Sequence, residues 1–313
     1  MRCSTAVIQA LMMHPNYRQH DWIMEEAIKM AKPHFKNQWD VSFLLNLDAK
    51  NAYEIIDPEI PRLIKTQKSN GLWKIKDSRR ISYGLLKALK YSRHLAIMLN
   101  EDRFRYDPFL SFREENDYYG LTVRQNIMES LLPEDAKLRN QLASDIFSQQ
   151  NADGSWNDTV IGTASHIETL LELGIGMDDP NIQKGTNWLF STYSEDVYRQ
   201  SNNMGGFLVA HNMFSSQNRY EEFKNALAEK PEWNPVGGCY MHLPIIQTGT
   251  AVKTLISLGF ENDSRVISAC DNLVELRQNY GGWCDSNIRN GLIAQKKTSR
   301  KILNEVEKFP WNS

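Results

Sequence analysis

Apolar residues recur every three or four positions over most of the chain, which is the periodicity of one face of an α-helix. No segment alternates apolar and polar residues for long enough to predict a β-strand. The sequence therefore predicts an all-α protein. Two kinds of helix alternate along it: longer segments with a polar face, and shorter, more apolar segments at 81–92, 162–174 and 248–259.

The ends of these helices are marked by particular residue types. Asp or Asn caps the free amide groups at a helix start, and Pro suits the first turn. Such residues open the polar-faced segments at Asp57-Pro58, Pro133, Asp179-Pro180 and Asn262-Asp263. Two of the more apolar helices end in Gly174 and Gly259, because glycine readily adopts the left-handed conformation that closes a helix.

A Gln-x-x-x-Gly-x-Trp pattern connects the two kinds of helix. Two full copies occur, at Gln67, Gly71 and Trp73 and at Gln150, Gly154 and Trp156. Weaker copies keep part of the pattern, at Gly281 and Trp283, at Gly205 and Phe207, and at Gly237 and Gly238. This recurrence indicates a repeat protein, in which each helical hairpin buries its apolar face only against its neighbours.

The repeat predicts a structural role for its three residues. Gln caps or tethers neighbouring helix ends, Gly permits the turn, and Trp wedges between repeats. Roughly six hairpins fit the chain, and a closed ring of apolar inner helices inside a polar outer layer accounts for both faces. An open solenoid is the alternative. The ring is favoured because closure would bury the apolar stripes of the first helix, 3–13, against those of the last, 288–309.

Between about residues 50 and 290, the Gln-x-x-x-Gly-x-Trp units resemble the QW repeats of squalene-hopene and other terpene cyclases. The hairpins also look like the α/α toroid shared with protein prenyltransferase β subunits. The resemblance implies a single α/α-toroid domain over residues 1–313, with a central apolar cavity for an isoprenoid-like substrate.

The chain departs from these families at their reaction motifs. Cyclases that protonate an alkene carry an Asp-x-Asp-Asp acid before a Thr-Ala pair, but Thr163-Ala164 follows residues 159–162, which hold no carboxylate. No Asp-Asp-x-x-Asp cluster for magnesium diphosphate is found, and Asp178-Asp179 before Pro180 is typical of a helix cap. Proton-initiated and magnesium-diphosphate cyclisation are therefore disfavoured.

Composition and charge limit the kinds of partner and the cellular location expected for the chain. A formal charge of -2 over 313 residues provides no broad basic field for nucleic acid. The apolar stretch at 1–13 is interrupted by Gln9, so the sequence predicts neither a signal peptide nor an integral membrane segment. We therefore expect a cytoplasmic protein. The start directly at a helix suggests that upstream residues are missing. Four cysteines without a CxxC pair argue against a disulfide framework.

Thiol and imidazole groups are the remaining candidates for chemistry. Cys239 and His242 are spaced i and i+3, which places both on one side of a helical turn, and this pair of ligands suits zinc. In a similar Gly-Cys-Tyr context, prenyltransferase β subunits place a zinc-binding Cys, although their Asp two positions earlier is Gly237 here. Cys284 lies in the corresponding loop one repeat later.

We therefore expect a zinc site of Cys239, His242 and Cys284, completed by His166 or Cys3, where equivalent loops of a ring converge. A metal-free catalytic pair of Cys239 and His166 is one alternative, and ordinary packing is the other. Cys270, inside a polar-faced helix, is predicted to be a packing residue.

Three functions fit the sequence. The first is a cyclase-like or prenyltransferase-like enzyme that holds a hydrophobic small molecule in a cavity lined by Trp39, Tyr83, Phe207 and Tyr240. The second is a non-catalytic repeat protein that binds or organises partners. The third is a carbohydrate-active toroid, which needs two carboxylates at a fixed separation, and no start of an apolar helix offers an obvious pair.

Overall fold

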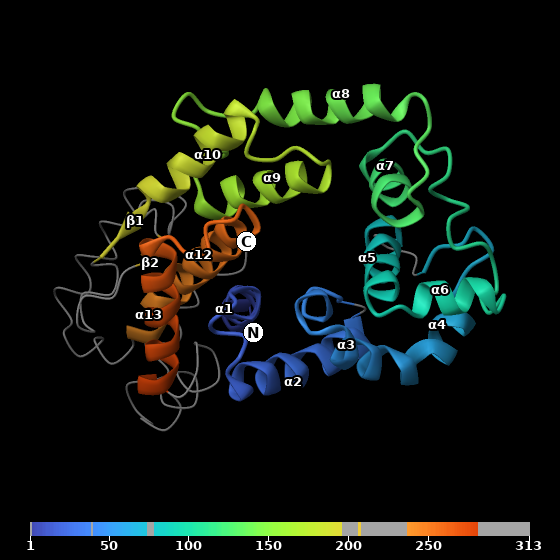
Figure 1. Cartoon of the computed structure of the whole chain (residues 1–313), viewed down its shortest axis with the longest axis horizontal. Coiled ribbons are helices and arrows are strands. Elements are labelled where there is room, and N and C mark those ends of the chain that lie inside the picture. The colour runs from blue at the N-terminus through green and yellow to red at the C-terminus, as the bar shows by residue number, and fades with distance from the viewer. Residues whose placement is uncertain (1, 39, 74–77, 196–205, 208–236, 281–313) are drawn as a thin grey trace, which may run out of the picture. The chain divides into compact units, whose positions relative to one another are not determined.

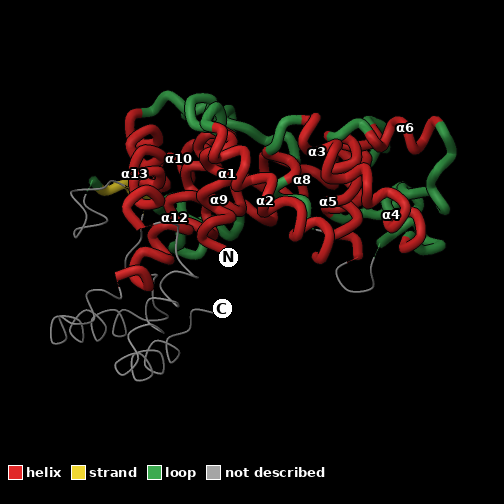
Figure 2. The backbone as a smooth tube through the Cα atoms, turned by 90° about the horizontal axis from the view of Figure 1, so that it is seen from below, coloured by secondary structure: helices red, strands yellow, loops and turns green. Residues whose placement is uncertain are grey.

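The computed structural model describes residues 2–38, 40–73, 78–195, 206–207 and 237–280. This part of the chain is mostly helical, as the periodicity predicted (Figure 1). The described residues contain one short exception, an antiparallel pair of two-residue strands, drawn in yellow in Figure 2. None of the described helices combines the length and the apolar character needed to cross a membrane.

The helices and strands have the following bounds. The α-helices are α1 (Arg2–Met13), α2 (Asp21–Gln38), α3 (Ala49–Ile56), α4 (Ile60–Thr66), α5 (Ser78–Tyr91), α6 (His94–Asn100), α7 (Tyr118–Val123), α8 (Asp135–Phe147), α9 (Val160–Glu172), α10 (Pro180–Ser191), α12 (Gly237–Ser257) and α13 (Ser264–Tyr280). The shorter elements are the 3-10 turns η1 (Leu44–Asn46) and η2 (Asp57–Glu59), the π-helix η3 (Arg124–Met128), and the strands β1 (Tyr193–Ser194) and β2 (Gly206–Phe207).

The chain divides into two compact units. Unit 1 comprises residues 1–14, 150–168 and 176–313, and unit 2 comprises residues 15–149 and 169–175. Helix α9 contributes its first part to unit 1 and its last turn to unit 2.

Several predicted helix ends are confirmed. Asp179 caps α10 by accepting a hydrogen bond from the Asn181 amide at 2.7 Å. Gly174 and Gly259 have φ of 82° and 88°, so both close their helices in the left-handed conformation. One boundary was wrong: α12 begins at Gly237, eleven residues before the predicted start, so the Gly237-Gly238 pair belongs to a helix instead of a turn.

The glutamines of the repeat tether separate segments: Gln150 reaches the start of a helix, as predicted, and Gln67 reaches the loop at Tyr106. The Nε2 atom of Gln67 donates to the carbonyls of Gly71 at 3.3 Å and Tyr106 at 2.9 Å. The Nε2 atom of Gln150 makes the same two kinds of bond, to the carbonyls of Gly154 and Asn181, both at 2.9 Å. Each glutamine therefore connects its own turn to a segment more than thirty residues later.

The aromatic residue of each repeat joins the turn to the following helix. The backbone amides of Trp73, Trp156 and Phe207 donate to the hydroxyls of Ser82, Thr163 and Thr248, at 2.8, 2.9 and 3.1 Å respectively. All three aromatic side chains are buried, with at most 1% of each residue exposed. We call this arrangement the repeat joint. It identifies α5, α9 and α12 as equivalent helices and sets their register.

In unit 1, the first helix packs along α12, as Figure 1 shows. The contact is close because Gly249 has no side chain: a Cβ there would lie 2.9 Å from the carbonyl carbon of Ala6. His14, just after α1, adds a bond of 2.9 Å between its Nε2 atom and the carbonyl of Glu261. The helix predicted at 288–309 as a partner for α1 lies outside the described residues.

Candidate functional site

Three tyrosines from two helices meet in unit 2. Tyr83 of α5 lies with its ring centroid 6.5 Å from that of Tyr118 and 6.0 Å from that of Tyr119, and the two α7 tyrosines are 5.2 Å apart. The pairs adopt edge-on or tilted arrangements, which aromatic rings prefer. Tyr83 is buried, whereas Tyr118 and Tyr119 are partly exposed. We call these residues the tyrosine cluster.

An ion pair lies against the tyrosine cluster. The Nζ atom of Lys87 is 2.5 Å from Oε1 of Glu172, the last residue of α9, and 5.2 Å from the centroid of the Tyr83 ring. The other carboxylate oxygen of Glu172 accepts a hydrogen bond from the Tyr118 hydroxyl. The side chains of Lys87 and Glu172 are 28% and 32% exposed, so solvent reaches this pair.

Burial and the charge of Glu172 keep the phenols neutral. Burial raises the pKa of Tyr118 far above its ordinary value, and the adjacent Glu172 carboxylate raises it further. The pKa of Tyr83 is raised by the same two causes in the same order. The hydroxyl of Tyr83 is surrounded by Glu172, Asn126 and Thr122, but within the described structure none meets it at hydrogen-bond geometry.

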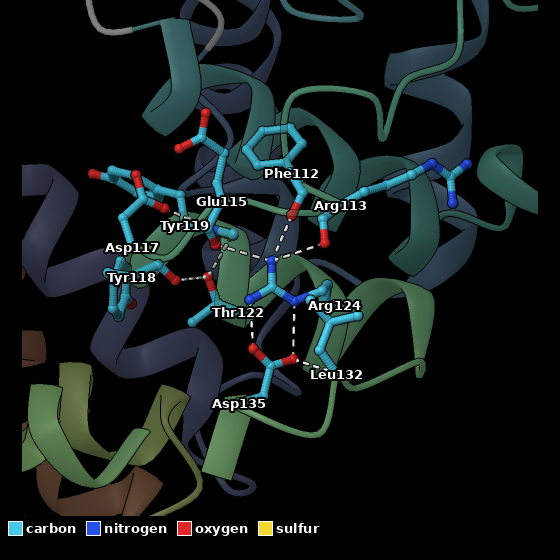
Figure 3. A network of polar contacts seen from close by, with 11 residues as sticks. Phe112, Arg113, Glu115, Asp117, Tyr118, Tyr119, Thr122, Arg124, Leu132 and Asp135 are labelled. Atoms are coloured by element: carbon cyan, nitrogen blue, oxygen red, sulfur yellow. Dashed lines mark hydrogen bonds and ion pairs between the residues drawn. The ribbon is translucent and has the colours of Figure 1, made fainter. Parts of the chain in front are cut away.

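A buried ion pair holds the segment that leads into α7, as Figure 3 shows. Arg124 and Asp135 are 1% and 0% exposed, and the guanidinium makes two bonds to the carboxylate, at 2.9 and 2.5 Å. The same guanidinium donates to the carbonyls of Phe112, Arg113 and Glu115 at 2.7, 3.2 and 3.0 Å. It therefore fixes the backbone just before the α7 tyrosines.

Asp117 continues this positioning. Its Oδ1 atom accepts the Gly120 amide at 2.8 Å and so caps α7, while its Oδ2 atom pairs with Arg79 of α5 at 2.6 Å. Arg79 also pairs with Glu115 at 2.7 Å. The helices that carry Tyr83 and Tyr118 are therefore linked by ionic contacts as well as by ring packing.

The π-helix η3 positions the end of α9. The side-chain amides of Gln125 and Asn126 donate to the backbone carbonyl of Glu172, at 3.4 and 3.0 Å. Lys90 of α5 donates to the carbonyls of Asn126 and Ile127 at 3.0 and 3.3 Å. Such short π-helical segments are frequent at functional sites, and this one holds the backbone of Glu172, whose side chain contacts Lys87 and Tyr118.

The site offers hydrogen bonds through a few defined groups. The Glu172 carboxylate accepts hydrogen bonds, the Lys87 ammonium donates them, and the tyrosine hydroxyls do both beside apolar ring faces. Sequence analysis identified Tyr83 but missed Lys87, Glu172 and Tyr118. Only Lys87 has a positional signal: like Glu168 and Lys253, it stands five residues after the hydroxyl residue of its repeat joint. The hydroxyl residues are known only from the structure, so the sequence alone does not give this spacing.

Unit 1 contains a comparable ion pair, for which no tyrosine contact is found among the described residues. Lys253 of α12 lies 2.9 Å from Oε2 of Glu168, and the hydroxyl of Thr254 donates to Oε1 of Glu168 at 2.8 Å. The side chains of Lys253 and Glu168 are 25% and 31% exposed, close to the values for Lys87 and Glu172. This pair is a natural reference for the one in unit 2.

Two of the residues predicted for the site have structural contacts in unit 1. His166 stacks on the indole of Trp156, with centroids 5.6 Å apart and planes 5° apart, and its Nδ1 atom lies 2.8 Å from the Gly162 carbonyl. Phe207 is fully buried and packs against Phe190 and Tyr193. Both side chains support a repeat joint.

The other predicted positions lie outside the described side chains: Cys3, Trp39, Cys239, Tyr240, His242 and Cys284. The backbone at Cys239 and His242 is helical, which agrees with the spacing argument but says nothing of a zinc site. Among the residues that the structure does describe, no three His, Cys, Asp or Glu side chains are arranged to hold a metal ion. Cys270 is fully buried, as predicted for a packing residue, and burial raises the pKa of its thiol.

Another polar group in unit 2 combines serine, histidine and aspartate. The Nδ1 atom of His94 lies 2.9 Å from Oγ of Ser92, and its Nε2 atom lies 3.4 Å from a carboxylate oxygen of Asp57. Ser92 and His94 are only 1% and 2% exposed, so the hydroxyl is inaccessible as a nucleophile. Burial lowers the pKa of His94, which favours the neutral ring. This group stabilises the junction of α5 and α6.

Comparison of the chain with protein-family models, with curated proteins and with solved structures found no match.

Proposed function

We propose that this chain is an α/α-toroid repeat protein that binds an isoprenoid-like hydrophobic small molecule at the tyrosine cluster, as a cyclase-like or prenyltransferase-like enzyme. The repeat joint supports the architecture, because three equivalent helices are fixed by the same amide-to-hydroxyl bond. If the chain forms the α/α toroid that its repeats resemble, α5 and its Tyr83 belong to the inner layer of helices.

The observation that carries the binding function is the tyrosine cluster itself. Tyr118 and Tyr119 present partly exposed aromatic rings above the buried Tyr83, next to a solvent-accessible acid–base pair. Aromatic rings bury a large apolar area while their hydroxyls remain available for hydrogen bonds. Such a surface suits a ligand that is mostly hydrocarbon with a small polar group.

The test is equilibrium binding of farnesol, a soluble isoprenoid probe, to the full chain, followed by calorimetry or protein fluorescence. Tyr119→Leu replaces a partly exposed ring without touching the ion pair. We expect a roughly three- to tenfold loss of affinity, because a good aromatic contact is worth about 0.5–1.5 kcal/mol.

Tyr91→Leu is the matched control, since Tyr91 lies on α5 but outside the tyrosine cluster, and it should leave the affinity unchanged. Absence of farnesol binding, or equal losses in the two variants, would reject the tyrosine cluster as the site. Tight binding without conversion of the probe would favour the non-catalytic form of the proposal.

A further inference from the structure

The accessible polar groups beside the tyrosine cluster have unused hydrogen-bonding capacity. An ionised carboxylate offers about four acceptor positions and an ammonium group three donors. Glu172 uses one position on each oxygen, for Lys87 and Tyr118. Lys87 has no other hydrogen-bond partner in the part of the chain that the structure describes.

A hydroxyl group complements this pair, because it donates one hydrogen bond and accepts others. It can donate to a free position on Glu172 while accepting from Lys87. A carbonyl oxygen cannot donate to the carboxylate, and a hydrocarbon satisfies neither group. The carbon chain of the same ligand can then lie against Tyr118 and Tyr119.

The local charges disfavour an anionic head group. The Lys87 ammonium is compensated by Glu172 at 2.5 Å, and Lys90 pairs with Glu129 at 2.5 Å. Arg79 is similarly paired with Asp117 at 2.6 Å. A diphosphate placed here would meet the Glu172 carboxylate, and the described residues provide no surplus of positive charge to attract it.

We propose that Glu172 and Lys87, with Tyr118 holding the carboxylate in place, recognise the hydroxyl group of a neutral hydrophobic alcohol. This inference rests on the proposed function and narrows its ligand from isoprenoid-like molecules in general to alcohols. Tyr118 acts here as a positioning residue, because its hydroxyl is already bonded to Glu172.

The test compares three probes that share a carbon chain and differ in the head group: farnesol, farnesyl diphosphate with and without Mg²⁺, and the hydrocarbon farnesene. For the unaltered full chain, farnesol should bind more tightly than either of the others. Lys87→Met keeps the length of the stem but removes the donors. This substitution should lower the affinity for farnesol about tenfold, which corresponds to one good hydrogen bond to a charged group. The affinity for farnesene should stay unchanged.

Lys253→Met is the matched control, because Lys253 forms the comparable pair with Glu168 and contacts no tyrosine among the described residues. This control should change neither the affinity for farnesol nor that for farnesene. Glu172→Gln provides a second variant that keeps the shape of the side chain but loses its charge. It should lower the affinity for farnesol and leave the affinity for farnesene unchanged. Circular dichroism establishes that each variant is folded.

The outcomes separate the two proposals. If farnesene binds as tightly as farnesol, or if Lys87→Met weakens both equally, the hydroxyl assignment is wrong while binding of an isoprenoid stands. Tighter binding of farnesyl diphosphate also overturns the hydroxyl assignment. If no probe binds, both proposals are rejected.

Discussion

The carbonyl oxygen of Lys184 lies so close to Gly154 that a Cβ atom on the glycine would come within 2.5 Å of it. Gly154 also has φ of 101°, a conformation that other residues rarely adopt. The first restriction comes from packing of the turn against α10, and the second is the backbone conformation of the turn itself. The glycine of the Gln-x-x-x-Gly-x-Trp pattern is therefore required for two reasons, its backbone conformation and the lack of space for a side chain.

Gly154→Ala should destabilise the protein by about 2–4 kcal/mol, because it combines backbone strain with overpacking against a carbonyl. The measurement is urea unfolding followed by circular dichroism. Gly176→Ala is the control, since nothing lies within 4 Å of a Cβ at that position. If the two variants lose equal stability, the close packing of the turn is not what the glycine provides.

The repeat could be predicted from sequence because its determinants are local. Glycine, tryptophan and glutamine act within a few residues of one another, and their residue types leave few other interpretations. The structure adds the bonds that the pattern cannot specify, such as the pairing of Gln150 with Asn181 and of Trp156 with Thr163. Those partners are common residue types that carry no signal of their own.

The candidate site was largely hidden for the opposite reason. Tyr118 and Glu172 are 54 positions apart and meet only through packing of α7 against the end of α9. In the sequence, nothing distinguishes Glu172 from an ordinary charged residue near a helix end. Tyr83 was identified because it is an aromatic residue on an apolar helix, which the repeat pattern predicts to line a central cavity.

The Arg124–Asp135 pair gives a prediction for stability and its dependence on pH. Asp135→Asn leaves the buried guanidinium without its counter-charge and should cost about 3–5 kcal/mol. Arg124 lowers the pKa of Asp135 below its ordinary value of 3.8 in the folded protein. The pair therefore contributes fully above pH 4, and its contribution is lost as the pH falls through the lowered pKa.

Urea unfolding between pH 7 and pH 2 tests this prediction. The difference in unfolding free energy between the natural protein and Asp135→Asn should be largest near neutral pH and shrink below pH 4. Lys29→Met is the control, because Lys29 is 77% exposed in its pair with Glu26 and such pairs contribute little. A difference that stays constant with pH would show that the carboxylate is not the group responsible.

The buried hydroxyl of Tyr83 gives the last prediction. A buried hydroxyl without a hydrogen bond costs about 1–3 kcal/mol, and no described group satisfies this one. Tyr83→Phe should therefore leave stability unchanged or raise it. Tyr118→Phe, which removes the bond to the Glu172 carboxylate, should lower stability by about 1.5–3 kcal/mol. Both are measured by urea unfolding at neutral pH, where the two phenols are protonated. If Tyr83→Phe proves the more destabilising of the two, the Tyr83 hydroxyl has a partner in solution, and Glu172 beside it is the first group to examine.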